Sequence, residues 1–68
     1  MDLDIKLLES CLGKKIVLGV PDFSQKRPVF MHYGVLEEVG DKGVLLQEFN
    51  KEHPTYIAFK HILIIRQM

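Results

Sequence analysis

The chain has 68 residues, which predicts a single domain over residues 1–68 that lies near the lower size limit for stability from its own core. Nine basic and nine acidic residues give a formal net charge of zero, which excludes a strong overall attraction to nucleic acid, so any anion binding must come from local clustering. The longest apolar runs have four or five residues, too few to cross a membrane, and no charged-then-apolar leader marks secretion.

Cysteine and histidine usage limits the kinds of support available to so small a domain. Cys11 is the only cysteine, which excludes an intrachain disulfide and favours a reducing, cytoplasmic location. It falls on the apolar side of a helical pattern, where a buried, inert thiol is expected. His32, His53 and His61 lie in separate segments without metal-ligand spacing, so we expect no metal site. Self-association is the remaining support, and 47% apolar residues favour it.

The sequence predicts one helix followed by five short strands. Apolar residues recur at helical spacing over residues 2–12, Asp2 or Asp4 can cap the start, and Gly13 suits the left-handed position that ends a helix. Segments rich in apolar and β-branched residues, separated by proline, glycine and polar turn residues, predict strands at residues 15–20, 29–39, 43–49, 55–59 and 62–66.

The connections between these segments predict how the strands pair. Residues 21–28 and 50–54 read as exposed loops, with Pro21 stopping the first strand, and residues 40–43 read as a tight hairpin turn. Gly34 lies in the middle of a long strand and predicts a bend or bulge there. Short connections favour antiparallel neighbours, so we expect a mostly β fold: a helix and a bent five-stranded antiparallel sheet that closes as a small barrel, with the helix across one open end.

The C-terminal run Ile62-Leu63-Ile64-Ile65 does not alternate with polar residues, so we expect a strand covered on both faces. An uncovered strand of this kind would be an aggregation hazard in a monomer. The chain also lacks a nucleophile–base pairing, a metal-ligand cluster and a glycine-rich phosphate cradle, so we expect a binding protein, neither an enzyme nor a carrier of a cofactor.

Two blocks of residues carry a resemblance to a known family. Gly34-Val35-Leu36 through Val44-Leu45-Leu46 has a glycine at a bend, an apolar residue two positions on, and then a turn and an apolar strand. Phe59-Lys60-His61 falls at the hinge between the last two strands. The first block resembles the first Sm motif and the second resembles the Tyr-Lys-His of Hfq, so the whole chain, in element order, resembles an Sm-like protein and most closely the bacterial Hfq branch.

The resemblance implies a homo-oligomeric ring that acts as an RNA chaperone or regulator. In such rings the fourth strand of one subunit pairs with the fifth strand of its neighbour. Single-stranded RNA binds near the central pore, and the face of Hfq that carries these pockets prefers uridine. It implies a subunit interface and a repeated RNA pocket. The interface would use Tyr56, Phe59, Ile62, Leu63, Ile64 and Ile65, and the pocket would use Gly40, Asp41, Lys42, Lys60 and His61.

The sequence departs from the family at the turn between the second and third strands. Hfq has an Asp, a Gln and a base-stacking aromatic there, whereas this chain has Gly40, Asp41 and Lys42, so the stacking residue is missing from that position. Asp41 would repel phosphate, and Lys42 near Lys60 would attract it with little choice of base.

The loops over residues 21–28 and 47–55 are longer than their counterparts in Hfq, and this difference leaves a second hypothesis open. Lys26 and Arg27 beside Phe23 form either a further contact site for RNA or protein, or a solvated loop with a packed aromatic anchor. The alternative to the RNA-binding ring is therefore a ring of the same fold that binds protein and has lost specific RNA binding.

Overall fold

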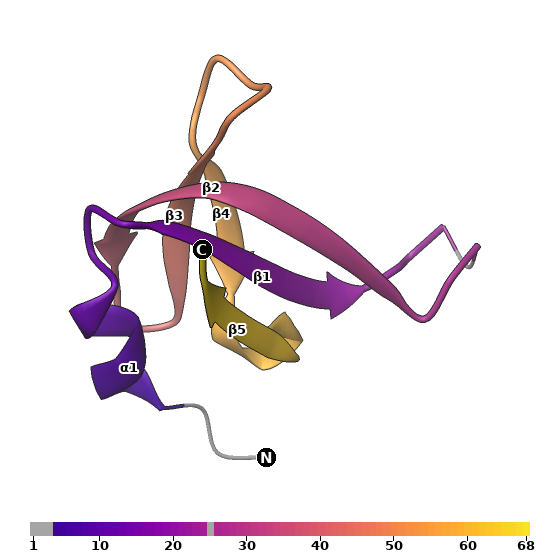
Figure 1. The fold of residues 1–68 in the computed structure, drawn as a ribbon. Helices are drawn as coiled ribbons and strands as arrows, with labels where there is room; N and C mark the ends of the chain where they lie inside the picture. Colours follow the sequence, from indigo (N-terminus) through magenta and orange to yellow (C-terminus); the bar gives the residue numbers. More distant parts are fainter. Residues whose placement is uncertain (1–3, 25) are drawn as a thin grey trace.

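The computed structural model describes residues 4–24 and 26–68 as one short helix and a single antiparallel sheet of five strands (Figure 1). The mostly β architecture with an N-terminal helix is therefore as predicted. In chain order the elements are α1 (Ile5–Ser10), β1 (Lys15–Pro21), β2 (Val29–Val39), β3 (Gly43–Glu48), β4 (Thr55–Ala58), the 3-10 turn η1 (Phe59–His61) and β5 (Ile64–Gln67).

The sheet is open, so the predicted closed barrel is wrong. The strands lie in the order β4-β3-β2-β1-β5, which makes β4 and β5 the two edge strands. After β4, η1 turns the chain, and the N–H of Leu63 donates to the carbonyl oxygen of Gly19 at 2.8 Å. The C-terminal segment therefore pairs with β1, at the opposite edge of the sheet from β4, instead of forming a hairpin with β4.

The core lies between α1 and the inner face of the sheet. Because side chains alternate along a strand, the register places Leu36 of β2 opposite Leu46 of β3 on this face, and both are fully buried. Cys11 is also buried, as predicted. The buried cluster contains Leu8, Cys11, Ile16, Leu18, Val20, Leu36, Val44, Leu46, Ile57 and Ile62.

The helix is shorter than the predicted residues 2–12, of which residues 2 and 3 lie outside the described residues. Asp4 caps it, since its side chain accepts a hydrogen bond of 3.1 Å from the N–H of Leu7. Gly13 has a φ of 78°, the predicted left-handed conformation, and its N–H donates to the carbonyl oxygen of Leu36 at 2.8 Å. Because the N–H of Gly13 bonds to β2 and not to a carbonyl oxygen of α1, the helix ends before Gly13.

The irregularity expected at Gly34 lies three residues further along β2. The register with β3 shifts between Leu36 and Glu38, so Glu37 is the extra residue of a bulge, and Val39 returns to pair with Val44 near the core. Gly34 meets a different requirement, because a Cβ there would overlap the backbone carbonyl of Gln47 on β3. The glycine thus permits the close approach of two strands.

The other strand boundaries differ from the prediction by a few residues. β1 includes Pro21, which pairs with Val29, and β4 ends at Ala58, where η1 begins. β5 is residues Ile64–Gln67 instead of 62–66, because Ile62 still belongs to the turn: its N–H donates to the carbonyl oxygen of Phe59 at 3.0 Å. Residues 22–24 and 26–28, between β1 and β2, and residues 49–54, between β3 and β4, project away from the sheet in different directions (Figure 1).

The apolar C-terminal run is covered in part by the chain itself. Ile62 is buried in the core and Ile65 packs against it. Ile64 is half-buried, and Leu63 is 45% exposed. The inner side of this run therefore needs no second copy of the chain, whereas Leu63 stays at the surface. In the described part of the chain, no helix has the length and apolar character that a membrane crossing needs.

Candidate nucleic-acid interface

The turn between β2 and β3 meets η1 through a backbone hydrogen bond. The N–H of Phe59 donates to the carbonyl oxygen of Lys42 at 2.9 Å, while the N–H of Gly40 donates to the carbonyl oxygen of Gly43 at 2.8 Å and closes the turn. These two segments are far apart in the sequence, and each carries residues predicted to bind RNA. The structure therefore brings the turn and the Phe59-Lys60-His61 motif into contact within one chain.

An open cavity of about 480 Å³ lies where the turn and η1 meet. We call it the turn–hinge pocket. Three of the five predicted RNA-binding residues line it, namely Asp41, Lys42 and Lys60. Gly40 lies beside it, in a neighbouring depression of about 240 Å³ that Tyr56 also lines. The lining of the turn–hinge pocket is Asp41, Lys42, Tyr56, Ala58, Phe59 and Lys60.

Tyr56 supplies an aromatic ring to this pocket from β4. Its side chain is 59% exposed and lies against Gly43, so part of the ring is fixed and part is accessible. Tyr56 was predicted to lie at the subunit interface, and the turn itself contains no aromatic residue at Gly40, Asp41 or Lys42. Strand alternation is the signal that could have placed it, because residues 56 and 58 share one face of β4, next to the hinge.

The charged groups of the pocket are free of partners within residues 4–24 and 26–68. Asp41, Lys42 and Lys60 are exposed, and none of their side chains makes a hydrogen bond or an ion pair there. The pocket thus combines the aromatic side chains of Tyr56 and Phe59, two ammonium donors and one carboxylate acceptor. Such a set can bind a planar base together with a phosphate.

His61 lies apart from the turn–hinge pocket. Its ring makes an edge-on contact with Phe23, with the ring centroids 5.3 Å apart and the planes at 71°. Both residues line a second depression of about 170 Å³, which shares Tyr56 and Ala58 with the turn–hinge pocket. Lys60 and His61 therefore line two adjoining depressions, and the role predicted for His61 stays a prediction.

The cluster predicted in the loop over residues 22–28 is divided. The Nε of Arg27 donates to the Asp22 carboxylate at 3.3 Å, and the guanidinium lies 4.9 Å from the ring centroid of Phe30. The hydroxyl and N–H of Ser24 also donate to Asp22, and these bonds hold the pKa of that carboxyl below its usual value. Arg27 thus stabilises the loop itself, and Phe23 contacts His61 instead.

A buried carboxylate on β3 was not predicted from the sequence. Glu48 is only 6% exposed, and its Oε1 forms a 2.7 Å hydrogen bond with Nδ1 of His32. Its Oε2 accepts from the hydroxyl of Thr55 at 2.8 Å and lies 3.1 Å from Nζ of Lys51. Burial raises the pKa of Glu48, but the hydrogen bonds from His32, Thr55 and Lys51 outweigh it and leave the pKa below its usual value. The network joins β2, β3 and β4.

The predicted subunit-interface residues lie on or beside the two edge strands. Tyr56 is on β4, Phe59 begins η1, and the remaining four lie in or just before β5. Within the described residues, β4 pairs with β3 alone and β5 with β1 alone, so each has one edge without a partner in the chain. Metal-binding clusters of three or more His, Cys, Asp or Glu side chains are absent from the described residues.

Comparison with known proteins identifies no relative of this chain. No protein-family model matches the sequence, and neither the curated proteins nor the solved structures contain a match.

Proposed function

We propose that this chain assembles into a cyclic homo-oligomer of the Sm-like kind and binds single-stranded RNA at the turn–hinge pocket of each subunit. The observation that carries the proposal is the 2.9 Å hydrogen bond between the N–H of Phe59 and the carbonyl oxygen of Lys42. It joins the two segments that carry the family resemblance around one pocket that holds an aromatic ring and two lysines.

The open sheet supports the assembly step. An edge strand presents unpaired N–H and C=O groups and tends to pair with another chain. If β4 of one subunit pairs with β5 of the next, the sheet continues from subunit to subunit and both edges are satisfied. The contact is head-to-tail, since two different edges meet, and such contacts generate a ring when the rotation closes. The exposed Leu63, directly before β5, would be covered in this contact.

The chemistry of the pocket supports the binding step. Stacking of one base on an exposed aromatic ring contributes about 1–3 kcal/mol, and Tyr56 offers such a ring. Lys42 and Lys60 supply positive charge for phosphate, which a neutral chain cannot supply through its overall field. Repetition around a ring multiplies weak contacts into a tight one, because the pockets then act on a single strand.

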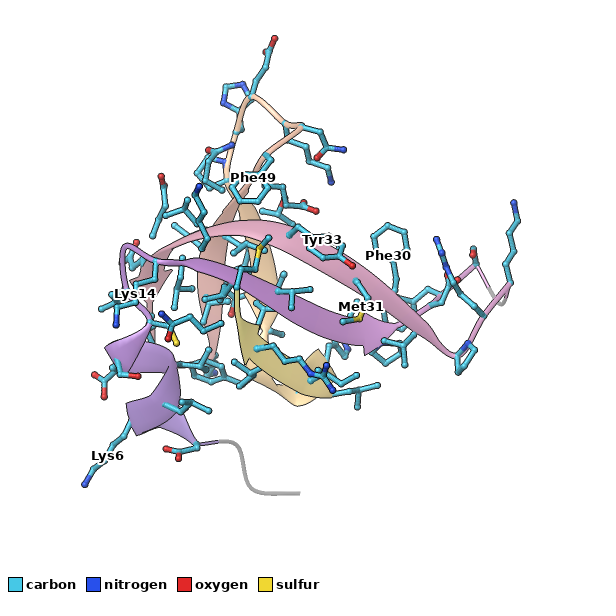
Figure 2. All side chains as sticks on the ribbon, viewed as in Figure 1. Lys6, Lys14, Phe30, Met31, Tyr33 and Phe49 are labelled. Atoms are coloured by element: carbon cyan, nitrogen blue, oxygen red, sulfur yellow. The ribbon has the colours of Figure 1, made fainter. Side chains whose placement is uncertain are left out.

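Fluorescence anisotropy with labelled short oligouridine and oligoadenosine tests this function. We expect binding that weakens as salt rises from about 50 mM to about 200 mM, because phosphate contacts release counterions. Lys60→Ala and Lys42→Ala should weaken binding, whereas Lys6→Ala removes the same charge from α1, where the side chain points away from the sheet (Figure 2), and should not. Absence of binding by the assembled protein at low salt would contradict the proposal.

A second candidate function, protein binding by the same ring, is favoured by exposed aromatic residues elsewhere on the sheet. The N–H of Phe49, which directly follows β3, donates to the carbonyl oxygen of Tyr33 on β2 at 3.2 Å, so these two exposed residues are neighbours on the side away from α1 (Figure 2). Capture of a protein partner that survives nuclease treatment and is lost in Tyr33→Ala would support this function. Recovery of RNA alone would count against it.

A further inference from the structure

We propose that the turn–hinge pocket selects guanine in single-stranded RNA, and that Asp41 is the residue that reads the base. This inference rests on the proposed RNA binding and adds a preference to it. It also differs from the uridine preference that the family resemblance implies. The carboxylate of Asp41 is the one group of the pocket that disfavours RNA, because it repels phosphate.

Asp41 is an acceptor without a donor. An ionised carboxylate can only accept hydrogen bonds, through two oxygens. Asp41 is exposed at the turn, lines the pocket and makes no hydrogen bond or ion pair within residues 4–24 and 26–68. A ligand that binds beside it must either tolerate a bare negative charge or bring donors to it.

Guanine is the base whose pairing edge best satisfies this requirement. Its N1–H and its 2-amino group are adjacent donors, so they can meet the two carboxylate oxygens together. Uracil offers one N–H between two carbonyl oxygens, which the carboxylate would repel. Adenine and cytosine place a ring-nitrogen acceptor beside their single amino group. A paired contact of this kind is the geometry that discriminates among bases in other complexes.

The remaining groups of the pocket suit the same base. Tyr56 offers an exposed aromatic surface for stacking, and a purine has a larger face to place on it than a pyrimidine. Lys42 and Lys60 can donate to the O6 and N7 acceptors of guanine or to the neighbouring phosphates. They also offset the repulsion between Asp41 and phosphate. The carboxylate of Asp41 therefore lowers the affinity for strands without guanine, but it does not lower the affinity for strands that place guanine beside it.

Short oligouridines that carry one central guanine, hypoxanthine, adenine or cytosine test the inference by competitive anisotropy. We expect the guanine strand to bind about 5- to 150-fold more tightly than all-uridine, as a bidentate contact gives. Hypoxanthine lacks the 2-amino group and should lose most of this advantage. This comparison uses the unmodified protein, so it does not depend on the folding of any variant.

Asp41→Asn separates base reading from charge. Removing the carboxylate should tighten binding to strands without guanine, whereas the guanine strand loses its paired contact, so the ratio between the guanine and uridine strands should fall toward one. Glu38→Gln is the matched control, because Glu38 is another exposed carboxylate close to the turn, lines only the neighbouring depression and should leave the ratio unchanged. An unchanged ratio in Asp41→Asn would overturn the inference.

The outcomes also distinguish this inference from the proposed function. Equal binding of the guanine and uridine strands by the unmodified protein overturns the guanine preference alone and leaves RNA binding intact. Absence of binding to every strand overturns both. Guanosine monophosphate that competes as well as the guanine strand would identify the ligand as a free nucleotide and overturn the assignment to RNA.

Discussion

The ring of Tyr56 on β4 packs against Gly43 on β3 so closely that a Cβ at residue 43 would lie 2.5 Å from Cζ of the ring. Such a Cβ would also lie 2.6 Å from the carbonyl oxygen of Ile57. Glycine at this position is thus a condition for the present position of Tyr56. The contact holds the aromatic ring beside the turn that carries Asp41 and Lys42.

Gly43→Ala should therefore lower stability and displace Tyr56. Forcing a methyl group into an occupied space costs about 1–3 kcal/mol, which thermal denaturation would detect as a lower Tm. Gly40→Ala is the matched control at the other end of the turn, because a Cβ there meets only the carbonyl oxygen of Gly43, at 3.4 Å. Equal Tm values for the two variants would show that the close contact is not as described.

Tyr56→Ala should weaken RNA binding about 5- to 150-fold, because removing one stacked base contact costs about 1–3 kcal/mol. Tyr56→Phe keeps the ring and should bind nearly as well as the unmodified protein. Tyr33→Ala is the control, since Tyr33 is 49% exposed on β2 and does not line the pocket. The stacking role is wrong if anisotropy gives Tyr56→Ala and Tyr33→Ala the same affinity.

Glu48→Ala should destabilise the fold by about 2–4 kcal/mol, measured by urea denaturation. The substitution leaves His32 and Thr55 without their shared acceptor in a largely buried site. Glu37→Ala is the control, because Glu37 is exposed at the bulge of β2 and should change stability by no more than about 0.5 kcal/mol. A small effect at Glu48 would mean that water satisfies His32 and Thr55 equally well.

The lowered pKa of Glu48 predicts a loss of stability in acid. Its usual value is 4.5, and the folded protein holds it lower, so the ionised carboxylate contributes fully above pH 4.5. The contribution is then lost as the pH falls below 4.5 and passes through the folded-state pKa. Urea denaturation between about pH 6 and pH 3 should show this decline, and Glu48→Gln should flatten it. Asp22→Asn reports the part that comes from Asp22, whose pKa is also lowered. An unchanged slope in Glu48→Gln would contradict the assignment.

Local sequence signals predicted the elements whose limits depend on nearby residues. The apolar-rich segment between Pro28 and Gly40 predicted β2 with its observed bounds, and residues 40–43 predicted the hairpin turn. Features that depend on distant pairing were missed. The bulge at Glu37 is a shift of register between β2 and β3, and the sheet stays open because β5 pairs with β1 instead of β4.

Some residues of the candidate site were predicted from the sequence and others were not. The resemblance grouped Asp41, Lys42 and Lys60, which do line one pocket. His61 was grouped with them, but its ring contacts Phe23, which lies in the loop after β1. The hydrogen bond between Glu48 and His32 joins residues 16 positions apart, and neither residue lies in a local sequence pattern that predicts it.

Leu63→Lys tests the edge contact that the ring requires. Leu63 is 45% exposed directly before β5, so a charge there should weaken association between copies. Leu12→Lys is the matched control, since Leu12 is 44% exposed beyond the end of α1 and should leave association unchanged.

The molar mass in solution is the most direct test of the account, because RNA binding around a pore presupposes neighbouring subunits. Light scattering of the purified protein at micromolar concentration should give a whole-number multiple of 7.9 kDa, well above two copies, that falls in Leu63→Lys and not in Leu12→Lys. A mass of 7.9 kDa for the unmodified protein would contradict the ring.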